Sequence, residues 1–259
     1  MTGAAGGAGS ARITIKTEEE IEAMRRAGRI VWQALTAMHA AIAPGVETAQ
    51  LDRVAENVIV SRGGTPSFKG YNGFPASVCT SVNDEVVHGI PGPRKLKPGD
   101  IISLDVGAIV DGYHGDGAAT YGVGEIKPAA QRLIRVTRQA LYEGLAQARA
   151  GRTLRDVARA IEARVERARY AVVRELVGHG IGRAMHEPPQ VPNYADGASD
   201  VELEAGMTLA IEPMVNAGGK DVVKDADGWT YRTADRSLSA HWEHTVVIRR
   251  FGAEIITTR

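Results

Sequence analysis

The sequence predicts an α+β fold in which two similar halves contribute to an antiparallel sheet covered by two pairs of helices. Three observations predict it. Amphipathic helical stretches occur in two pairs, and each pair is followed by strand-like alternation of apolar residues. In addition, LKPGDIISLD (96–105) aligns without gaps on LEAGMTLAIE (203–212). We expect the halves at about 12–124 and 125–259, related by a pseudo-twofold axis.

Composition narrows the class of protein. The 259 residues are 44% apolar and 24% charged, as in soluble globular proteins with a substantial core. The formal net charge of zero argues against nucleic acid as the main partner. No apolar run approaches the roughly 20 residues of a membrane helix. The single cysteine, Cys79, excludes a disulfide framework and a cysteine-based zinc site, so we expect a reducing, cytoplasmic location.

The first helix pair follows a short tail. Residues 1–11 are rich in glycine and alanine and lack the features of a signal peptide, so we expect a flexible tail before one domain, 12–259. Thr17 and the three glutamates after it form a capping box, and apolar residues recur at helical spacing as far as Ile42. Thr48 is expected to cap a second helix that ends before the glycine pair at 63–64.

The second helix pair has similar signals. Pro128 is a favourable first-turn residue, and the helix after it is expected to close at Gly151. Thr153 then starts a fourth helix, whose apolar positions continue to Val165. We interpret the apolar stripes of all these helices as core.

An acidic pair lies in the strands that follow the first helix pair. The Asp-Gly sequence at 111–112 predicts a two-residue hairpin turn, which pairs Gly107 with Asp116. Asp105 and Asp116 then share one face as diagonal neighbours, roughly 7–8 Å apart or a little less. Ionised acids on the inner face of a sheet need a partner. No lysine or arginine of this hairpin lies at a position whose side chain would share that face. A metal ion is one interpretation; an edge hairpin with both aspartates in solvent is the other.

Three further residues favour the metal. We expect Asp105 and Glu212 to end equivalent strands of the two halves, so the pseudo-twofold axis would bring the two carboxylates together. Glu243 lies in the last apolar strand region, and His179 lies in the glycine-rich loop GHGIGRAMHEPP. The four carboxylates match the charge of two divalent ions, and an oxygen-rich set with one nitrogen suits Mn, Fe(II), Co or Zn. Such ions, about 3.5–4 Å apart, can hold and acidify a bridging water.

Five motifs in order carry a resemblance to a known family: CTSVNDEVVHGIP, LDVGAIVDGYHGDGA, GHGIGRAMHEPPQV, GMTLAIEPM and DRSLSAHWEHT. Together they resemble the type I methionine aminopeptidases, from about residue 12 onward. The resemblance implies the pita-bread fold and removal of the initiator methionine from nascent proteins whose second residue is small. It implies a dinuclear metal site of five ligands: Asp105, Asp116, His179, Glu212 and Glu243.

The resemblance is to the compact bacterial form. Only 25 residues separate His186 from Glu212, which leaves no room for the helical insert of type II members. Nascent polypeptide N-termini are the implied substrates, and a transient contact with the ribosome is expected. We expect a monomer.

The resemblance also assigns roles at the site. His186 would reach the substrate carbonyl, His88 would lie near the scissile nitrogen, and Glu212 would act as general base and then acid for the attacking water that bridges the metals. The glycines around His179 would let the backbone turn closely beneath the metals. The methionine pocket would be formed by Tyr71, Phe74, Cys79, Met185 and Trp229. Met185 can equally be core, because relatives usually have an aromatic residue there.

Some residues have more than one interpretation. His114 shares parity with Asp116 but has no ligand role in the family, whereas His241 is a candidate for the mouth of the site. His244 is expected to point away from the face that carries Glu243. A monovalent cation is a further possibility implied by some relatives, near Asn83, Glu85 and Ser239.

Two other functions fit the same motifs. An Xaa-Pro aminopeptidase or prolidase would share the ligand set, but such enzymes usually carry an additional N-terminal domain. Since the first helix is expected to begin after Thr17, we expect none here. A non-catalytic binding module of the same fold is the second alternative. Such relatives have usually lost ligands, whereas all five are present in this sequence.

Overall fold

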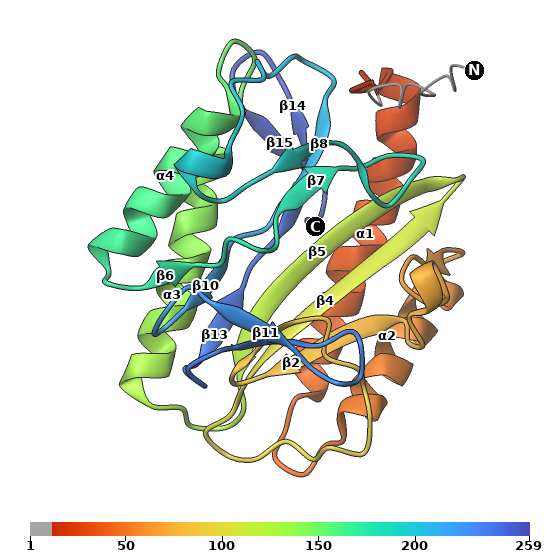
Figure 1. Cartoon of the computed structure of the whole chain (residues 1–259). Helices are drawn as coiled ribbons and strands as arrows, with labels where there is room; N and C mark the ends of the chain where they lie inside the picture. Colours follow the sequence, from red (N-terminus) through yellow and green to blue (C-terminus); the bar gives the residue numbers. More distant parts are fainter. Residues whose placement is uncertain (1–11) are drawn as a thin grey trace, which may run out of the picture.

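The structure, a computed structural model, describes residues 12–259, so the expected flexible tail at 1–11 lies outside the described residues. Within this range the predicted helices all form, and none is both long and apolar enough to cross a membrane. They cover one side of the sheets (Figure 1). Their bounds are α1 (Glu18–Ala41), α2 (Thr48–Ser61), α3 (Pro128–Leu145) and α4 (Leu154–Arg167).

Side chains cap the helices largely as expected. The Thr17 hydroxyl accepts from the Glu20 backbone N–H, and the Glu20 carboxylate accepts in return from the Thr17 backbone N–H. Thr153 caps α4 in the same reciprocal way with Asp156. Pro128 occupies the first turn of α3, as predicted. These contacts satisfy backbone donors that the first turn of a helix leaves without partners.

Two predicted helix boundaries are wrong. Thr48 is the first residue of α2 rather than its cap; Glu47 takes the cap position, and the Thr48 hydroxyl instead bonds both backbone groups of Gly92. The helix α3 ends at Leu145, before Gly151, because the chain turns there to pack Ala148 into the core. In both cases a tertiary contact outweighs the local signal.

The strands form four antiparallel groups. In the first half, β4 (Ile101–Val110) pairs with β1 (Thr65–Pro66), β2 (Val78–Val82) and β5 (Tyr113–Gly122). In the second half, the order is β15 (Ala253–Ile255), β14 (His244–Ile248), β9 (Thr208–Ile211), β7 (Gly178–Gly180) and β8 (Glu187–Val191). Two three-stranded groups complete the sheets: β13 (Ser239–His241), β10 (Met214–Asn216) and β6 (Ala171–Val172); and β11 (Val222–Lys224), β12 (Tyr231–Thr233) and β3 (Glu85–Val87). Short 3₁₀ turns lie at Tyr71–Gly73 and Ala195–Gly197.

Each helix pair packs on the strands of its own half. Apolar residues of α1 and α2 share one core cluster with β2 and β4. Those of α3 and α4 share another with β9, β10, β13 and β14. Figure 1 shows the two pairs on the same side of the strands, which leaves the opposite side open for a site.

Hydrogen bonds join the halves along β5. The backbone N–H of Glu243 donates to the Ala118 carbonyl, and the Thr245 hydroxyl bonds both backbone groups of Asp116. The Thr120 hydroxyl bonds both backbone groups of His241 in the same manner. The segment that carries Glu243 is therefore fixed against the strand that carries Asp116.

The hairpin has the predicted register. Gly107 lies opposite Asp116, and the turn residues Asp111 and Gly112 both have positive φ, 50° and 77°, as a type I′ turn requires. The expectation that Asp105 ends its strand is wrong, because the hairpin extends β4 to Val110.

Glu212, in contrast, directly follows the end of β9. Pro213 comes next and has no backbone N–H to continue the ladder, so the chain resumes as β10 one residue later. The two aligned segments therefore place their carboxylates differently: Asp105 lies within a continuous strand, and Glu212 lies at a break.

Candidate metal centre

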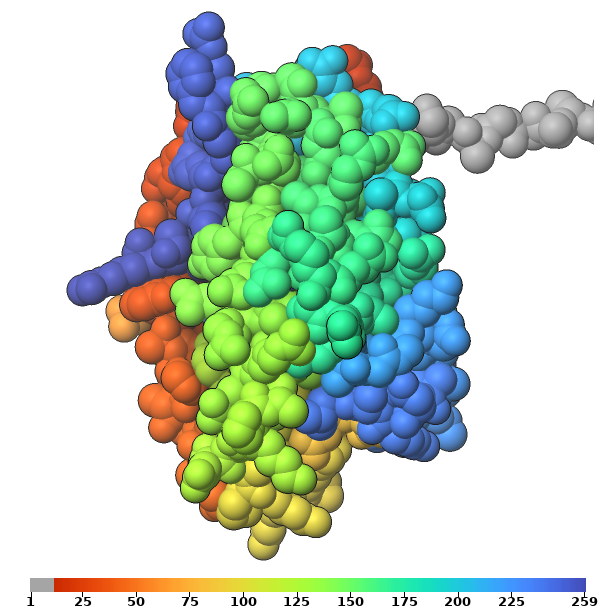
Figure 2. Space-filling model, turned by 90° about the vertical axis from the view of Figure 1, so that its left-hand side faces the viewer, coloured from red at the N-terminus to blue at the C-terminus, as the bar shows by residue number. Residues whose placement is uncertain are grey.

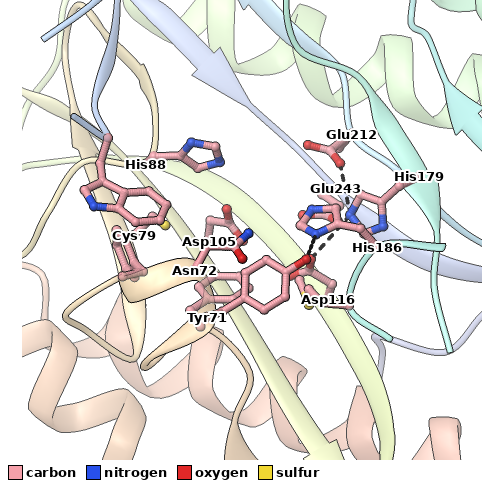
Figure 3. Close-up of a pocket in the computed structure, with 14 residues that line it drawn as sticks. Tyr71, Asn72, Cys79, His88, Asp105, Asp116, His179, His186, Glu212 and Glu243 are labelled. Atoms are coloured by element: carbon pink, nitrogen blue, oxygen red, sulfur yellow. Dashed lines mark hydrogen bonds and ion pairs between the residues drawn. The ribbon is translucent and has the colours of Figure 1, made fainter. Parts of the chain in front are cut away.

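The structure brings the five predicted ligands together around one cavity of about 190 Å³. Figure 3 shows their side chains converging from the two halves. Asp105 comes from β4, Asp116 from β5 and His179 from β7, while Glu212 follows β9 and Glu243 lies between β13 and β14. Strands of a rigid sheet thus carry or flank each of these side chains, which fixes their relative positions.

The distances suit shared coordination of cations. His179 Nε2 lies 3.6 Å from Glu212 Oε1 and 3.9 Å from Asp116 Oδ2. One ligand atom each from Asp116, His179 and Glu243 lie within 4.8 Å of one another. The other ring nitrogen of His179, Nδ1, lies 2.8 Å from the carbonyl of Gly180, which leaves Nε2 as the nitrogen directed at the acids.

The acids are unstable as a metal-free cluster of anions. Burial raises the pKa of Asp105 to about 7 and that of Glu212 to about 8. The pKa values of Asp116 and Glu243 lie well above the usual range, because burial and the neighbouring carboxylates both disfavour ionisation. Asp105 Oδ1, Asp116 Oδ1 and Glu243 Oε1 are buried and have no hydrogen-bond partner among residues 12–259.

These observations test whether the residues fit metal ions. No lysine or arginine of the described chain lines the cavity, so no side-chain cation neutralises the acids. Burial lowers the pKa of His179 to about 3, which keeps its imidazole neutral and able to coordinate. Unpartnered carboxylate oxygens with one neutral nitrogen are the donor set that divalent ions bind. The site fits divalent metal.

Two more histidines line the cavity on opposite sides of Asp105 (Figure 3). His186 Nδ1 lies 2.7 Å from the hydroxyl of Tyr71, and its ring centroid lies 4.2 Å from that of His179. His88 packs edge-on against Tyr231, and burial lowers its pKa to about 4. Burial also lowers the pKa of His186, so both imidazoles are neutral near pH 7.

Comparison with known proteins agrees with this geometry. The model of metallopeptidase family M24 matches residues 22–250. The chain belongs to family M24. It is 50% identical over 245 residues to methionine aminopeptidase 1 of Bacillus subtilis, covering 95% of this chain and 99% of that one.

Solved structures give the same result for the fold. A crystal structure of methionine aminopeptidase from Thermotoga maritima aligns with a TM-score of 0.94 and 45% identity, covering 96% of this M24 chain and all of the other. Prolidase from Pyrococcus furiosus aligns with a TM-score of 0.75 at 22% identity, over 95% of this chain and 65% of that one, which shows the shared fold alone. The predicted pita-bread fold and the predicted family are confirmed.

Glycines around His179 serve close packing in this M24 chain. A Cβ on Gly178 would lie 2.3 Å from the Ala210 carbonyl oxygen, and one on Gly180 would lie 2.2 Å from the Pro188 carbonyl oxygen. Neither glycine has a positive φ. These two glycines therefore let β8 and β9 approach the strand that carries the histidine, while a close turn of the backbone beneath the metals stays a prediction.

A buried ion pair shapes the loop between His179 and His186. Lys16 Nζ lies 2.5 Å from Glu187 Oε2, and the other Glu187 oxygen accepts from the Ala184 backbone N–H at 3.2 Å. A Cβ on Gly182 would lie 2.5 Å from Lys16 Cε, so glycine makes room for the pair. Nothing in the sequence pattern marked Lys16, because its partner is far away along the chain.

The predicted pocket residues gather at one end of the cavity of this M24 chain. Their shared feature is an apolar or sulfur-containing side chain that lines the cavity: Tyr71, Phe74, Cys79, Met185 and Trp229. Phe74 and Trp229 meet edge to face with ring centroids 5.1 Å apart. Phe68 and Asn72 also line the cavity, and sequence reasoning missed both. They lie in an irregular segment with no periodicity to mark them.

The other histidines considered in the sequence lie outside the set of proposed metal ligands, in different places. His241 does not line the cavity; it is buried, so its predicted place at the mouth is wrong. The Nδ1 atom of His114 bonds the Ser67 hydroxyl at 3.0 Å, outside the ligand set. His244 bonds Thr257 and is absent from the cavity lining, as expected from its parity.

The three residues proposed for a monovalent cation are only partly together. The Ser239 backbone N–H donates to the Asn83 carbonyl at 2.9 Å, which places these two side by side. The Glu85 carboxylate instead pairs with Arg94 and Arg232 at 2.8 Å each. Its charge is therefore already neutralised.

Proposed function

We propose that this protein removes the initiator methionine from nascent proteins whose second residue is small. One observation carries the proposal: a small cavity combines a buried cluster of four acids and one imidazole with an apolar, sulfur-containing pocket at one end. Aromatic edges and sulfur suit a methionine thioether. The relatives named methionine aminopeptidase support the same activity, since they match this chain over nearly its whole length.

We propose that Asp105, Asp116, His179, Glu212 and Glu243 hold two divalent ions. Mn, Fe(II), Co and Zn all suit this donor set. When bound, the ions supply an acidified water and an electrophile for the carbonyl oxygen. A monovalent cation near Asn83 and Ser239 stays a prediction; with Glu85 committed to arginines, only neutral oxygens are left for it.

The chain's own residues then divide the work. If the Tyr71 hydroxyl donates to Nδ1 of His186, the ring carries its proton on Nε2, where it can donate to the scissile carbonyl oxygen. His88, on the other side of the cavity, steadies the leaving nitrogen. Glu212 takes a proton from the attacking water and returns it to the leaving amine, so no net proton is left on the protein.

Replacing His88 or His186 by alanine is expected to lower kcat by about 10- to 100-fold, because each removes one hydrogen bond that strengthens in the transition state. Both variants should bind the same amount of divalent metal as the unchanged protein, since neither imidazole belongs to the ligand set. Metal content by atomic absorption, measured beside kcat, checks this division. Loss of metal from either variant would contradict it.

Peptide cleavage tests the function itself. We expect hydrolysis of Met-Gly-X tripeptides and none of X-Pro-X tripeptides, with Mn, Fe(II), Co and Zn each supplied to the metal-free protein. The reverse preference would establish the Xaa-Pro activity of the prolidase-like alternative. A protein that binds metal and cleaves neither peptide would be the non-catalytic alternative.

A ribosome contact is also proposed, and the charge distribution supports a surface for it. Residues 128–174 hold eleven arginines and four acidic residues, although the whole chain is neutral. Figure 2 shows α3 and α4 side by side on one face. Arg135 and Arg159 are exposed there, and no ion pair of the described residues includes either. The monomeric state and the cytoplasmic location stay predictions.

Charge reversal tests this surface. The double variant R135E/R159E is expected to lose salt-sensitive cosedimentation with ribosomes, because phosphate contacts fall steeply with both charge and salt. Its cleavage of Met-Gly-X should stay unchanged, since both residues lie outside the cavity lining. Cosedimentation equal to that of the unchanged protein at low salt would place any contact elsewhere.

A further inference from the structure

His241 is a buried imidazole that none of the roles above uses. It ends β13, is 1% exposed and lies outside the lining of the cavity. Neither of its ring nitrogens has a hydrogen-bond partner among the described residues. An unpartnered buried polar group costs about 1–3 kcal/mol. Such a residue requires a physical explanation.

The neighbour that faces this imidazole is the carboxylate of Glu212. His241 Nε2 lies 3.6 Å from Glu212 Oε2, and His179 Nε2 lies 3.6 Å from Glu212 Oε1. The two oxygens of one carboxylate therefore face two different imidazoles. Because His179 lines the cavity and His241 does not, Oε1 faces a ring in the cavity wall and Oε2 faces a ring outside that wall.

The backbone holds His241 in this place. In the pairing of β13 with β10, His241 lies opposite Met214, which is two positions after Glu212 in the chain. The Thr120 hydroxyl bonds both the N–H and the carbonyl of His241, each at 2.8 Å. The backbone of His241 is therefore fixed between β10 and the Thr120 hydroxyl of β5, and the burial of the residue limits where its ring can turn.

We propose that His241 is a positioning residue for Glu212, with its Nε2–H directed at Oε2 so that Oε1 stays turned toward the metal centre. This inference rests on the proposed function, because it takes Glu212 as ligand and proton carrier. A separation of 3.6 Å is a few tenths of an ångström longer than a hydrogen bond, so a small rotation of the ring closes it. Removing a hydrogen-bond partner of a metal ligand commonly lowers metal affinity or activity 10- to 100-fold.

Direct coordination by His241 is the alternative. One ligand atom each from Glu212, His241 and Glu243 lie within 4.8 Å of one another. Positioning is favoured because His241 is not among the residues that line the cavity, whereas the five proposed ligands all are. The two roles differ in what they require: a positioning residue needs only an N–H donor, whereas a ligand needs a nitrogen lone pair.

Two variants separate these roles. H241L removes the donor at similar bulk, and H241Q supplies an amide N–H donor without the ring nitrogen lone pair. Each is loaded with Co²⁺, which reports ligand changes through its visible absorption spectrum, and titrated by calorimetry. We expect H241L to lose 10- to 100-fold in kcat on Met-Gly-X at saturating Co²⁺, with KM within threefold. H241Q should return kcat to within threefold of the unchanged protein, and its Co²⁺ spectrum should match.

Matched measurements make the result decisive. H244L removes a histidine three positions along the chain that is absent from the cavity lining, and it should leave kcat and the Co²⁺ spectrum unchanged. The thermal midpoints of the metal-free variants show whether H241L folds; if it does not, H241Q alone decides.

Three results would overturn positioning: unchanged kcat in a folded H241L, kcat in H241Q below one tenth of the unchanged protein, or a changed Co²⁺ spectrum in H241Q. Failure of the proposed function is distinguishable. The unchanged protein would then bind no Co²⁺ or cleave no Met-Gly-X, before any His241 variant is made.

Discussion

Replacing Glu212 by glutamine is expected to lower kcat by about 10²- to 10⁴-fold, the range of general acid–base catalysis. The amide keeps the size of the side chain but cannot accept a proton from the attacking water. It also removes one of four negative charges from a cluster in which burial has already raised the pKa of this carboxyl to about 8. kcat on Met-Gly-X is measured at saturating metal, so that weaker metal binding does not mimic loss of chemistry.

E204Q is a matched control for this experiment. Glu204 is exposed and lies outside the cavity lining, so the same chemical change there should leave kcat unchanged. A kcat of E212Q above one tenth of the unchanged value would remove Glu212 from the role of proton carrier. That result would not contradict the proposal that the five residues bind metal.

Removing the metal is expected to make stability depend on pH above neutrality. Burial raises the pKa of Asp105 to about 7 and of Glu212 to about 8, above the values these groups have when unfolded. Groups with a raised folded pKa stabilise the protein while they are protonated, and this contribution is lost as the pH rises through the folded pKa. Burial and the neighbouring carboxylates also raise the pKa values of Asp116 and Glu243 well above the usual range, which acts in the same direction.

The buried histidines act in the opposite direction, but at lower pH. Burial lowers the pKa values of His88 and His179 to about 4 and about 3, so their neutral forms are fully favourable once the unfolded histidines are also neutral. With an unfolded pKa near 6.5, that change is nearly complete by about pH 7.5. The window from pH 7.5 to 9 therefore reports the carboxylates together with the buried Cys79 thiol, whose pKa burial also raises and which acts in the same direction.

We expect the midpoint of thermal unfolding of the metal-free protein to fall by roughly 5–10 °C between pH 7.5 and 9, equivalent to about 2–4 kcal/mol. Saturating divalent metal should raise the midpoint most at the high end of this window, because protons no longer compete for the ligands. Differential scanning calorimetry with and without metal measures both. A metal-free midpoint that rises from pH 7.5 to 9 would contradict the buried acidic cluster.

The secondary structure that local signals control was predictable. The capping threonines, Pro128 and the Asp-Gly turn act on their immediate neighbours, and the helices and the hairpin register followed from them. Thr48 was misassigned because its hydroxyl bonds Gly92, a partner that no local pattern reveals. The end of β4 was misplaced because the alignment with the second half stopped at Asp105, whereas hairpin pairing continues to Val110.

The candidate site was predictable where the chain repeats itself or matches a family motif. The five ligands converge because each lies on, or directly beside, a strand of the two related halves. What could not be predicted depends on packing at long range. Phe68 and Asn72 reach the cavity from an irregular segment, and the parity of His241 could not show that it lies behind Glu212 rather than at the mouth.

The Lys16–Glu187 pair has a consequence for biosynthesis. Its two members are 171 positions apart, and the carboxylate that Lys16 holds also fixes the backbone next to His186. A growing chain presents Lys16 early and Glu187 only after most of its length has left the ribosome. Until then the loop that carries His186 lacks this anchor, so it can take its final position only after Glu187 has emerged.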